Sequence, residues 1–273
     1  MNETHLEKAK HFRALHEGPA FVIPNPWDIG TARILAGFGF QALATSSAAA
    51  AASLGRKDGE LTRDEAIAHA QLIANATDLP VSADLEKGYG DTPDDVAETV
   101  RRAVGAGLAG CTIEDATRDP ARPIYDDSLA IERIAAAAEA ARTFKFPFML
   151  TARAHGFLFN PASLEDVFHR LQAFEKAGAD VLFAPGLPDI ASVRQLCAAV
   201  TKPVNFMAGL KGKSFPIRDL VDAGIKRISL ATSLYRAAMT GMLNAIREIQ
   251  DRGEFSFLDD SVATADLIAR MRL

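Results

Sequence analysis

Acidic and basic side chains follow three short apolar segments in the middle of the chain, at the point where each segment ends. Asp84 and Glu86 follow the first segment, Glu114 the second, and Arg153 with His155 the third. Carboxylates in one confined site repel each other unless a cation neutralises them. Oxygen ligands suit a hard ion such as Mg²⁺, which binds one or two carboxylates directly and keeps several waters. The residues therefore predict a Mg²⁺ site, beside which Arg153 would bind an anionic substrate through its guanidinium fork.

Histidine and lysine side chains near the same segment ends leave other chemistries open. His155 can act as a general acid or base beside the predicted metal site, and a structural or solvated histidine explains its position equally well. Lys87 and Lys211 could form a Schiff base, as in a class I aldolase. Neither lysine lies within an apolar strand that would lower its pKa, so the sequence favours the metal site over the Schiff base.

Eight short apolar segments alternate with helical stretches along the chain. The segments are apolar throughout rather than at every second residue, which is typical of strands covered on both faces. Capping residues at Thr62, Thr92 and Ser163 begin helices, and Ala-Gly pairs end several of them. The predicted strands cover residues 20–24, 41–45, 80–84, 110–114, 147–153, 179–184, 203–207 and 226–231.

This repeated strand–helix unit predicts an α/β fold, a (β/α)₈ TIM barrel in a single domain over residues 1–273. Extra helices are expected at residues 1–16, 232–252 and 260–270. A doubly wound open sheet is the alternative architecture. The spacing Gly105-x-Gly107-x-x-Gly110 has the form of a dinucleotide-binding loop, but it runs from a helix into a strand and is interpreted as a helix C-cap.

The composition restricts the class of protein. The chain has 273 residues, of which 48% are hydrophobic and 24% charged, so it can bury a large core. Its formal net charge of -5 argues against a nucleic-acid-binding protein. No apolar run approaches the roughly 18 residues that span a bilayer, and the charged N-terminal stretch is unlike a signal peptide. A cytoplasmic protein that associates with neither nucleic acid nor membrane is therefore expected.

The predicted strand ends carry a series of short motifs in a specific order. On these motifs the chain resembles the isocitrate lyase/phosphoenolpyruvate mutase (phosphonomutase) superfamily along nearly its whole length. The resemblance implies a (β/α)₈ enzyme, dependent on Mg²⁺ or Mn²⁺, that breaks or forms a C–C or C–P bond of a small anionic 2-oxo acid through an enolate. The motifs are Asn25-Pro26-Trp27-Asp28, Thr45-Ser46-Ser47-Ala48, Asp84-x-Glu86-x-Gly88-Tyr89-Gly90, Ile113-Glu114-Asp115, Thr151-Ala152-Arg153 and Pro203-Val204-Asn205.

The resemblance also implies a role for each site residue. Asp84 corresponds to the direct metal ligand, while Glu86 and Glu114 would hold metal-bound waters. Arg153 corresponds to the group that binds the substrate carboxylate. The other implied site residues are the catalytic candidates Asp58, Glu114 and His155 and the substrate-binding candidates Trp27, Ser46, Ser47, Gly88, Tyr89 and Asn205.

Residues 116–128 are expected to form a mobile loop that closes over the site. The loop lacks the cysteine-containing segment of the isocitrate-type lyases, and neither Cys111, inside a predicted strand, nor Cys197 replaces it. An oxaloacetate- or phosphonopyruvate-like substrate is therefore expected. The alternatives are a 2-methylisocitrate lyase-like enzyme and a non-catalytic barrel that binds 2-oxo acids.

The C-terminal region, residues 232–273, contains apolar side chains that a barrel alone would leave uncovered, among them Met239, Met242 and Ile246. Members of the superfamily commonly assemble through C-terminal helices. The resemblance therefore implies a homodimer or homotetramer formed through this region.

Overall fold

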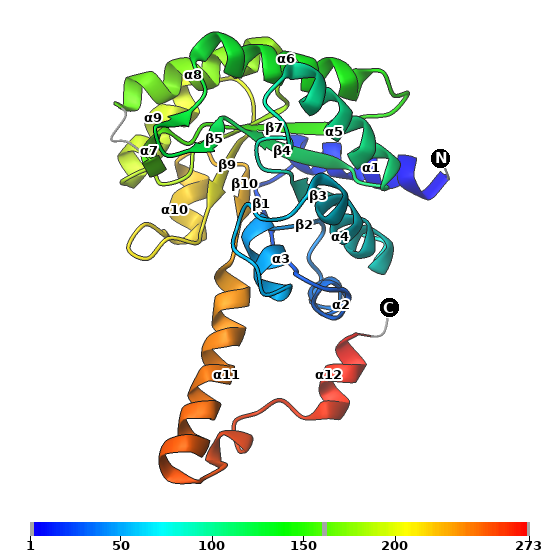
Figure 1. Ribbon diagram of the computed structural model, residues 1–273, viewed down its shortest axis with the longest axis vertical. Coiled ribbons are helices and arrows are strands. Elements are labelled where there is room, and N and C mark those ends of the chain that lie inside the picture. Colours follow the sequence, from blue (N-terminus) through cyan, green and yellow to red (C-terminus); the bar gives the residue numbers. More distant parts are fainter. Residues whose placement is uncertain (1–2, 160–162, 272–273) are drawn as a thin grey trace.

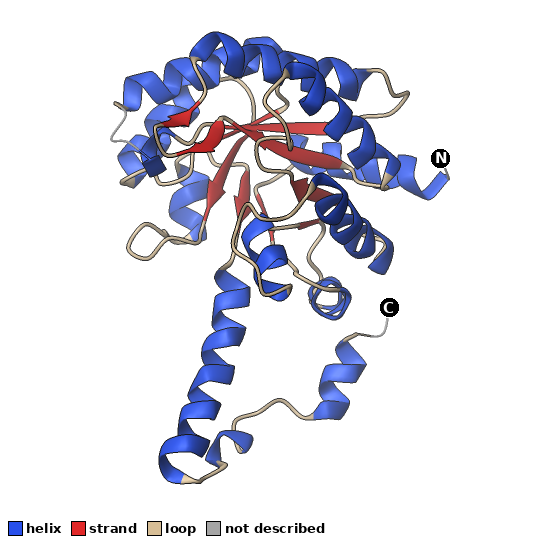
Figure 2. Ribbon diagram, viewed as in Figure 1, coloured by secondary structure: helices blue, strands red, loops and turns tan. Residues whose placement is uncertain are grey.

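The computed structural model describes residues 3–159 and 163–271 and contains a parallel eight-stranded sheet curved into a barrel (Figure 2). The strand order is β1-β10-β9-β8-β7-β4-β3-β2, and all seven ladders are parallel. This confirms the predicted (β/α)₈ barrel rather than the doubly wound sheet. The strands are β1 Phe21–Ile23, β2 Leu43–Ala44, β3 Val81–Asp84, β4 Gly110–Glu114, β7 Met149–Arg153, β8 Val181–Phe183, β9 Val204–Met207 and β10 Arg227–Ser229.

Helices surround the barrel, and the extra helices at both ends of the chain are confirmed (Figure 1). The second C-terminal helix begins at Thr264, four residues later than expected. The helices are α1 Glu3–Glu17, α2 Ile29–Gly37, α3 Ser47–Ser53, α4 Arg63–Ala76, α5 Pro93–Gly105, α6 Asp127–Arg142, α7 Gly156–Phe159, α8 Leu164–Ala177, α9 Ile190–Ala199, α10 Ile217–Asp222, α11 Ser233–Arg252 and α12 Thr264–Arg270, with a 3₁₀ turn at Ser256–Leu258.

The two ends of the barrel differ in what closes them. At the amino ends of the strands, Phe12 of α1 is completely buried and packs with Ile23, Met149 and Val181. The ladders end at β1 and β2, and a backbone hydrogen bond from Ala44 N to Pro24 O (3.0 Å) joins these two strands. Because α1 fills the amino end, the carboxyl ends of the strands are left for chemistry, as in other barrels of this type.

Local signals in the sequence set the helix ends as predicted. Thr62, Thr92 and Ser163 each form a capping box with the residue three positions later. Gly107 lies after the end of α5 with a positive φ, and β4 starts at Gly110, so the Gly-x-Gly-x-x-Gly spacing is a helix ending. The interpretation as a C-cap is therefore confirmed.

Replacing Thr62 with alanine is expected to lower the free energy of unfolding by about 1 kcal/mol. The Thr62 Oγ1 accepts a hydrogen bond from Glu65 N (3.3 Å), and Glu65 Oε2 accepts one from Thr62 N (2.9 Å). Alanine leaves Glu65 N without its hydrogen-bond acceptor. Urea denaturation measures the difference, and Thr62→Ser, which keeps the hydroxyl, should match the wild type. Equal midpoints for the alanine variant and the wild type would contradict the capping role.

Residues 116–128, expected to form a mobile loop, include a two-stranded antiparallel hairpin. Its strands are β5 Ala116–Asp119 and β6 Arg122–Ile124, and α6 starts directly afterwards. The strands pair locally, and Tyr125 N donates to Asp115 O (2.9 Å), which fixes the base of the hairpin to the end of β4. The hairpin therefore holds its side chains in defined positions above the carboxyl end of the barrel.

The C-terminal helix α11 extends away from the barrel, and α12 returns toward α2 (Figure 1). None of the side chains of α11 is buried. Its exposed apolar residues are Met242, Leu243, Ile246 and Ile249, at 40–48% exposure. None of the helices in the described part of the chain is long and apolar enough to cross a membrane.

Candidate active site

Asp84, the last residue of β3, lies at the centre of the carboxyl end of the barrel. Its Oδ2 accepts hydrogen bonds from Ser47 N (3.3 Å) and Ser47 Oγ (3.1 Å), and its Oδ1 accepts one from Glu86 N (3.3 Å). Burial raises the pKa of Asp84; Arg153 opposes the rise, and the neighbouring Glu114 adds to it. A cation placed against Asp84 would remove this penalty and favour the ionised carboxylate.

Glu86 follows Asp84 in a left-handed backbone conformation, with a φ of 52°. Its side chain is buried; Oε2 accepts a hydrogen bond from Arg118 Nη2 (2.9 Å), and Oε1 has no hydrogen-bond partner. Burial, opposed by Arg118 and reinforced by nearby carboxylates, raises the pKa of Glu86 to about 8. The unpartnered Oε1 in this acidic site leaves one position on Glu86 for a cationic or donor group.

Arg118 reaches Glu86 from the hairpin, across Gly59. Its Nη2 also lies 3.8 Å from Asp58 Oδ2, in an ion pair with a carboxylate that is 45% exposed. A Cβ atom at Gly59 would overlap the guanidinium, and the φ of Gly59 is 87°. Glycine is therefore required there for two reasons, the positive φ and the close approach of Arg118.

Glu114, at the end of β4, forms a buried cluster with two residues that follow β7. Its Oε2 lies 2.9 Å from His155 Nε2 and 3.5 Å from Arg153 Nη1. Burial raises the pKa of Glu114, but His155 and Arg153 outweigh burial and lower it to about 2. The cluster therefore holds Glu114 as an anion whose Oε2 faces the Nε2 atom of His155.

The backbone around His155 is held by Asp115 and Arg170. Asp115 Oδ1 accepts a hydrogen bond from His155 N (2.8 Å), and its Oδ2 accepts one from Arg170 Nη1 (3.0 Å). Arg170 lies on α8, 55 residues away in the chain. This contact, which the sequence analysis did not anticipate, ties the β4 and β7 ends together and positions His155 against Glu114.

Arg153 lies at the edge of the cavity with an unused donor. Its guanidinium packs over the Phe183 ring at 5.0 Å from the centroid, and its buried Nε has no hydrogen-bond partner. Ring stacking holds the planar fork in place without consuming its hydrogen-bond donors. Arg153 is therefore arranged to bind an anion.

A small cavity of about 50 Å³ opens between the strand ends. Of the residues predicted for the site, Ser46, Asp84, Arg153 and Asn205 line it. Ser47 contacts Asp84, and Glu86, Glu114 and His155 lie in the cluster described above. The remaining candidates lie outside the lining: Trp27 packs edge-on against Tyr235 (5.3 Å), Gly88 and Tyr89 form a turn with positive φ, and Asp58 meets the site through Arg118.

The fit of a metal ion to these residues depends on how many ligands the protein must supply. Within residues 3–159 and 163–271, no group of three or more His, Cys, Asp or Glu side chains is arranged to coordinate one ion. A site that uses Asp84 directly and reaches Glu86 and Glu114 through waters needs no such group, which is the usual pattern for Mg²⁺. The unpartnered Glu86 Oε1 supports this arrangement.

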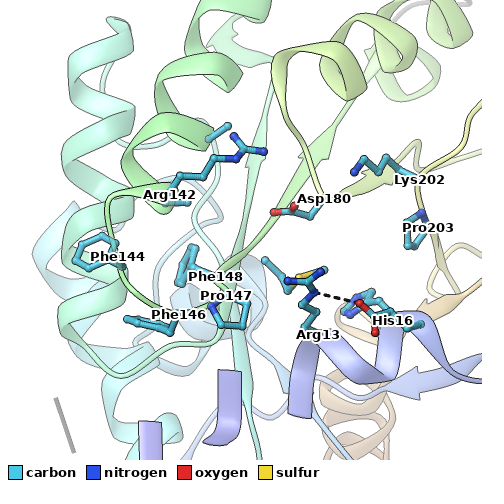
Figure 3. Close-up of a pocket in the computed structure, with 14 residues that line it drawn as sticks. Arg13, His16, Arg142, Phe144, Phe146, Pro147, Phe148, Asp180, Lys202 and Pro203 are labelled. Carbon is cyan, nitrogen blue, oxygen red and sulfur yellow. Dashed lines mark hydrogen bonds and ion pairs between the residues drawn. The ribbon is translucent and has the colours of Figure 1, made fainter. Parts of the chain in front are cut away.

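A larger cavity, about 480 Å³, lies at the opposite end of the barrel (Figure 3). Its wall includes Arg13, Arg142, Asp180 and Lys202 together with three phenylalanines. It is remote from the strand ends that carry the acidic cluster. Its three cations, Arg13, Arg142 and Lys202, face the two carboxylates Glu17 and Asp180, so most of the positive charge in this cavity is already balanced.

A parallel barrel with carboxylates and an arginine at its carboxyl end is typical of enzymes of the (β/α)₈ class. The family model described as Phosphoenolpyruvate phosphomutase matches residues 12–250. The chain belongs to this family, within the isocitrate lyase/phosphoenolpyruvate mutase superfamily, whose related members are lyases and mutases.

Three similar proteins illustrate the range of the family. A solved structure from Burkholderia cenocepacia has a TM-score of 0.97 and 45% identity and covers 100% of this chain and 98% of that one. A Corynebacterium glutamicum protein named Probable 2-methylisocitrate lyase 2 is 30% identical, over 90% of this chain and 82% of its own. An oxaloacetate decarboxylase of Rhodopseudomonas palustris is 32% identical, over 84% of this chain and 79% of its own.

Proposed function

We propose that the protein is a Mg²⁺-dependent enzyme that cleaves or forms a C–C or C–P bond of a small 2-oxo acid through an enolate. The observation that carries the proposal is that Asp84 and Arg153 line one small cavity, with Glu114 Oε2 3.5 Å from Arg153 Nη1. Mg²⁺, or Mn²⁺ in its place, would be held by Asp84 directly and by Glu86 and Glu114 through waters. When bound, the metal supplies positive charge that stabilises the oxygen on which the enolate develops.

The side chains of the protein bind and orient the substrate. Arg153 binds the substrate carboxylate with its fork and so aligns the breaking bond with the carbonyl π system. Ser46, the N-cap of α3 in the cavity lining, and the backbone of Ser47 would provide a second anchor for the substrate. His155 is the candidate acid–base group, and Glu114, 2.9 Å from its Nε2, orients the ring as a fixed anion.

The remaining predicted site residues have less direct roles in this proposal. Asp58 holds Arg118 over the site, and Asn205 contributes an amide to the cavity wall. Trp27, which packs edge-on against Tyr235, would form an outer wall of the pocket. The turn containing Gly88 and Tyr89 sets the direction of Glu86.

An oxaloacetate- or phosphonopyruvate-like acid is the favoured substrate. Burial raises the pKa of Cys111 in β4 and raises that of Cys197 to about 11, so neither thiol is a good acid–base group at neutral pH. The similarity to an oxaloacetate decarboxylase supports the same substrate class. The similarity to a 2-methylisocitrate lyase makes that acid the second candidate.

Incubation of the purified protein with oxaloacetate, phosphonopyruvate and 2-methylisocitrate, with Mg²⁺ or with EDTA, tests this proposal. Turnover of one of these acids with Mg²⁺ and its loss in EDTA is the expected result. Tight binding of oxalate without turnover of any acid would favour a non-catalytic binding barrel. Turnover that persists in EDTA would contradict the proposed dependence on a metal ion.

A homodimer or homotetramer formed through the C-terminal region is part of the proposal. The apolar stripe of α11, from Met242 to Ile249, is exposed in the single chain and suits a second copy. We expect the wild type to sediment as a dimer or tetramer and Ile246→Glu to shift it toward monomer. Gln250→Glu, which adds the same charge on α11, should leave the assembly intact. A monomeric wild type at micromolar concentration would contradict this assembly.

A cytoplasmic location completes the proposal. The thiols of Cys111 and Cys197 are both free, so the fold requires no oxidising compartment. The binding partner that we propose for the protein, besides a second copy of itself, is the small anionic substrate.

A further inference from the structure

Arg227 of β10 is a buried arginine inside the barrel, close to the proposed substrate site. It is 4% exposed and lines the cavity together with Asn205 and Ser229. Its Nε donates to Asn205 Oδ1 (2.8 Å), and its Nη2 donates to Thr151 Oγ1 (2.9 Å). These are amide and hydroxyl partners, so they satisfy the donors of Arg227 without neutralising its charge.

The third partner of Arg227 is His16, at the amino end of the barrel (labelled in Figure 3). His16 Nδ1 lies 2.8 Å from Phe12 O, which assigns the proton to Nδ1 and leaves Nε2 to accept from Arg227 Nη1 at 3.4 Å. Burial, together with Arg227, lowers the pKa of His16 to about 3, so the ring is neutral at physiological pH. His16 is therefore also an uncharged partner.

The positive charge of Arg227 has no counter-charge beside it. Burial lowers the pKa of Arg227 to about 9, so the group is a cation at neutral pH. In the described part of the chain, no carboxylate forms an ion pair with it. Buried charges are ordinarily paired because an isolated one is costly to desolvate. The cavity that Arg227 lines is the place where an anion could balance it.

Arg227 also determines which end of the Asn205 amide faces the cavity. Arginine has donors only, so the atom of Asn205 that meets Arg227 Nε must be the carbonyl oxygen. The amide nitrogen then points the other way, with one N–H donated to Ser229 Oγ (3.0 Å). These contacts leave the second N–H free to serve a ligand in the cavity that Asn205 lines. This wall therefore offers a donor backed by a positive charge.

We propose that Arg227 is a positioning residue for the substrate site: it fixes the Asn205 amide as a hydrogen-bond donor and supplies the charge that favours an anion at this wall. The inference rests on the proposed function, since it concerns how the same cavity binds its anionic substrate. It adds a second cationic wall, formed by β9 and β10, opposite the acids of β3 and β4.

Oxalate binding in the presence of Mg²⁺, measured by calorimetry, tests the inference. Arg227→Met, which is apolar and of similar volume, should raise the dissociation constant about tenfold. The matched control is His16→Leu, which removes a partner of Arg227 other than Asn205. This variant should be less stable than the wild type, but its oxalate affinity should stay within about twofold of the wild-type value. Arg227→Met with unchanged affinity would overturn the inference, as would an equal loss in both variants.

A second pair of variants keeps the test valid if Arg227→Met does not fold. Arg227→Lys keeps the charge but loses the fork, so it should bind oxalate with intermediate affinity. Asn205→Asp keeps an acceptor for Arg227 and removes the amide donor, so it should fold and bind oxalate at least tenfold more weakly. Wild-type affinity in Asn205→Asp would overturn the inference.

A readout that needs no ligand separates this inference from the proposed function. In protein labelled with ¹⁵N-asparagine, the Asn205 side-chain amide resonance, identified by its loss in Asn205→Asp, should be a single sharp pair in the wild type and in His16→Leu. It should shift and broaden in Arg227→Lys. If the wild type does not bind oxalate, the proposed function fails, while the amide signal still decides whether Arg227 orients Asn205.

Discussion

Replacing Asp84 with asparagine is expected to lower kcat/KM by on the order of 10³-fold. Asparagine has nearly the same shape and can still accept a hydrogen bond from Ser47, so the end of β3 should keep its structure. It lacks the negative charge that would hold the metal, and stabilisation of the enolate would be lost with the metal. Steady-state kinetics on the acid that is turned over, together with Mg²⁺ titration calorimetry, measure both effects.

The matched control for Asp84 is Asp64→Asn on α4, where the side chain is 81% exposed. It changes the net charge equally and should leave kcat/KM within about twofold, because surface substitutions away from the site have small effects. A metal affinity in Asp84→Asn equal to that of the wild type would exclude Asp84 as the direct ligand. Normal metal binding with lost turnover would assign it a different catalytic role.

Replacing Arg153 with lysine is expected to raise KM by roughly 100-fold. Lysine keeps the charge next to Glu114 but cannot form two parallel hydrogen bonds to a carboxylate. It also loses the planar group that packs over Phe183 at 5.0 Å. Because the contact to the substrate carboxylate exists before the reaction begins, most of the loss should appear in KM rather than kcat.

The control for Arg153 is Arg101→Lys on α5, a half-exposed arginine paired with Glu98. It makes the same chemical change in solvent and should leave both constants within about twofold of the wild type. A loss confined to kcat in Arg153→Lys would show that the guanidinium acts in the transition state. An unchanged KM with normal kcat would remove Arg153 from the site.

The sequence predicted the barrel because its signals are local. Apolar strands and capping residues act over a few positions, so Thr62 with Glu65 or Ser163 with Asp166 can be recognised without knowing the fold. The hairpin at residues 116–124 escaped prediction because its short, polar strands have no periodic pattern. Its position depends on Tyr125 binding the backbone of Asp115 at the end of β4.

The candidate site was predictable where it lies directly at strand ends. Asp84, Glu114 and Arg153 each end a strand, and parallel strands bring those ends together. Arg170 and Arg227 were missed because their roles depend on partners remote in sequence: Arg170 on Asp115, 55 residues away, and Arg227 on Thr151, 76 residues away. The one local signal for Arg227 was a charged residue at the first position of β10.

The junction between β1 and β2 makes folding and ligand binding depend on each other. Besides the backbone bond from Ala44 to Pro24, the Asn25 side chain spans this junction, donating to Thr45 O (2.9 Å) and accepting from Leu230 N (2.9 Å). Asn25 and Ser46 both line the cavity. An anion that contacts both Asn25 and Ser46 would stabilise the closed junction. Tighter binding of the anion should therefore slow hydrogen exchange of the Ala44 amide.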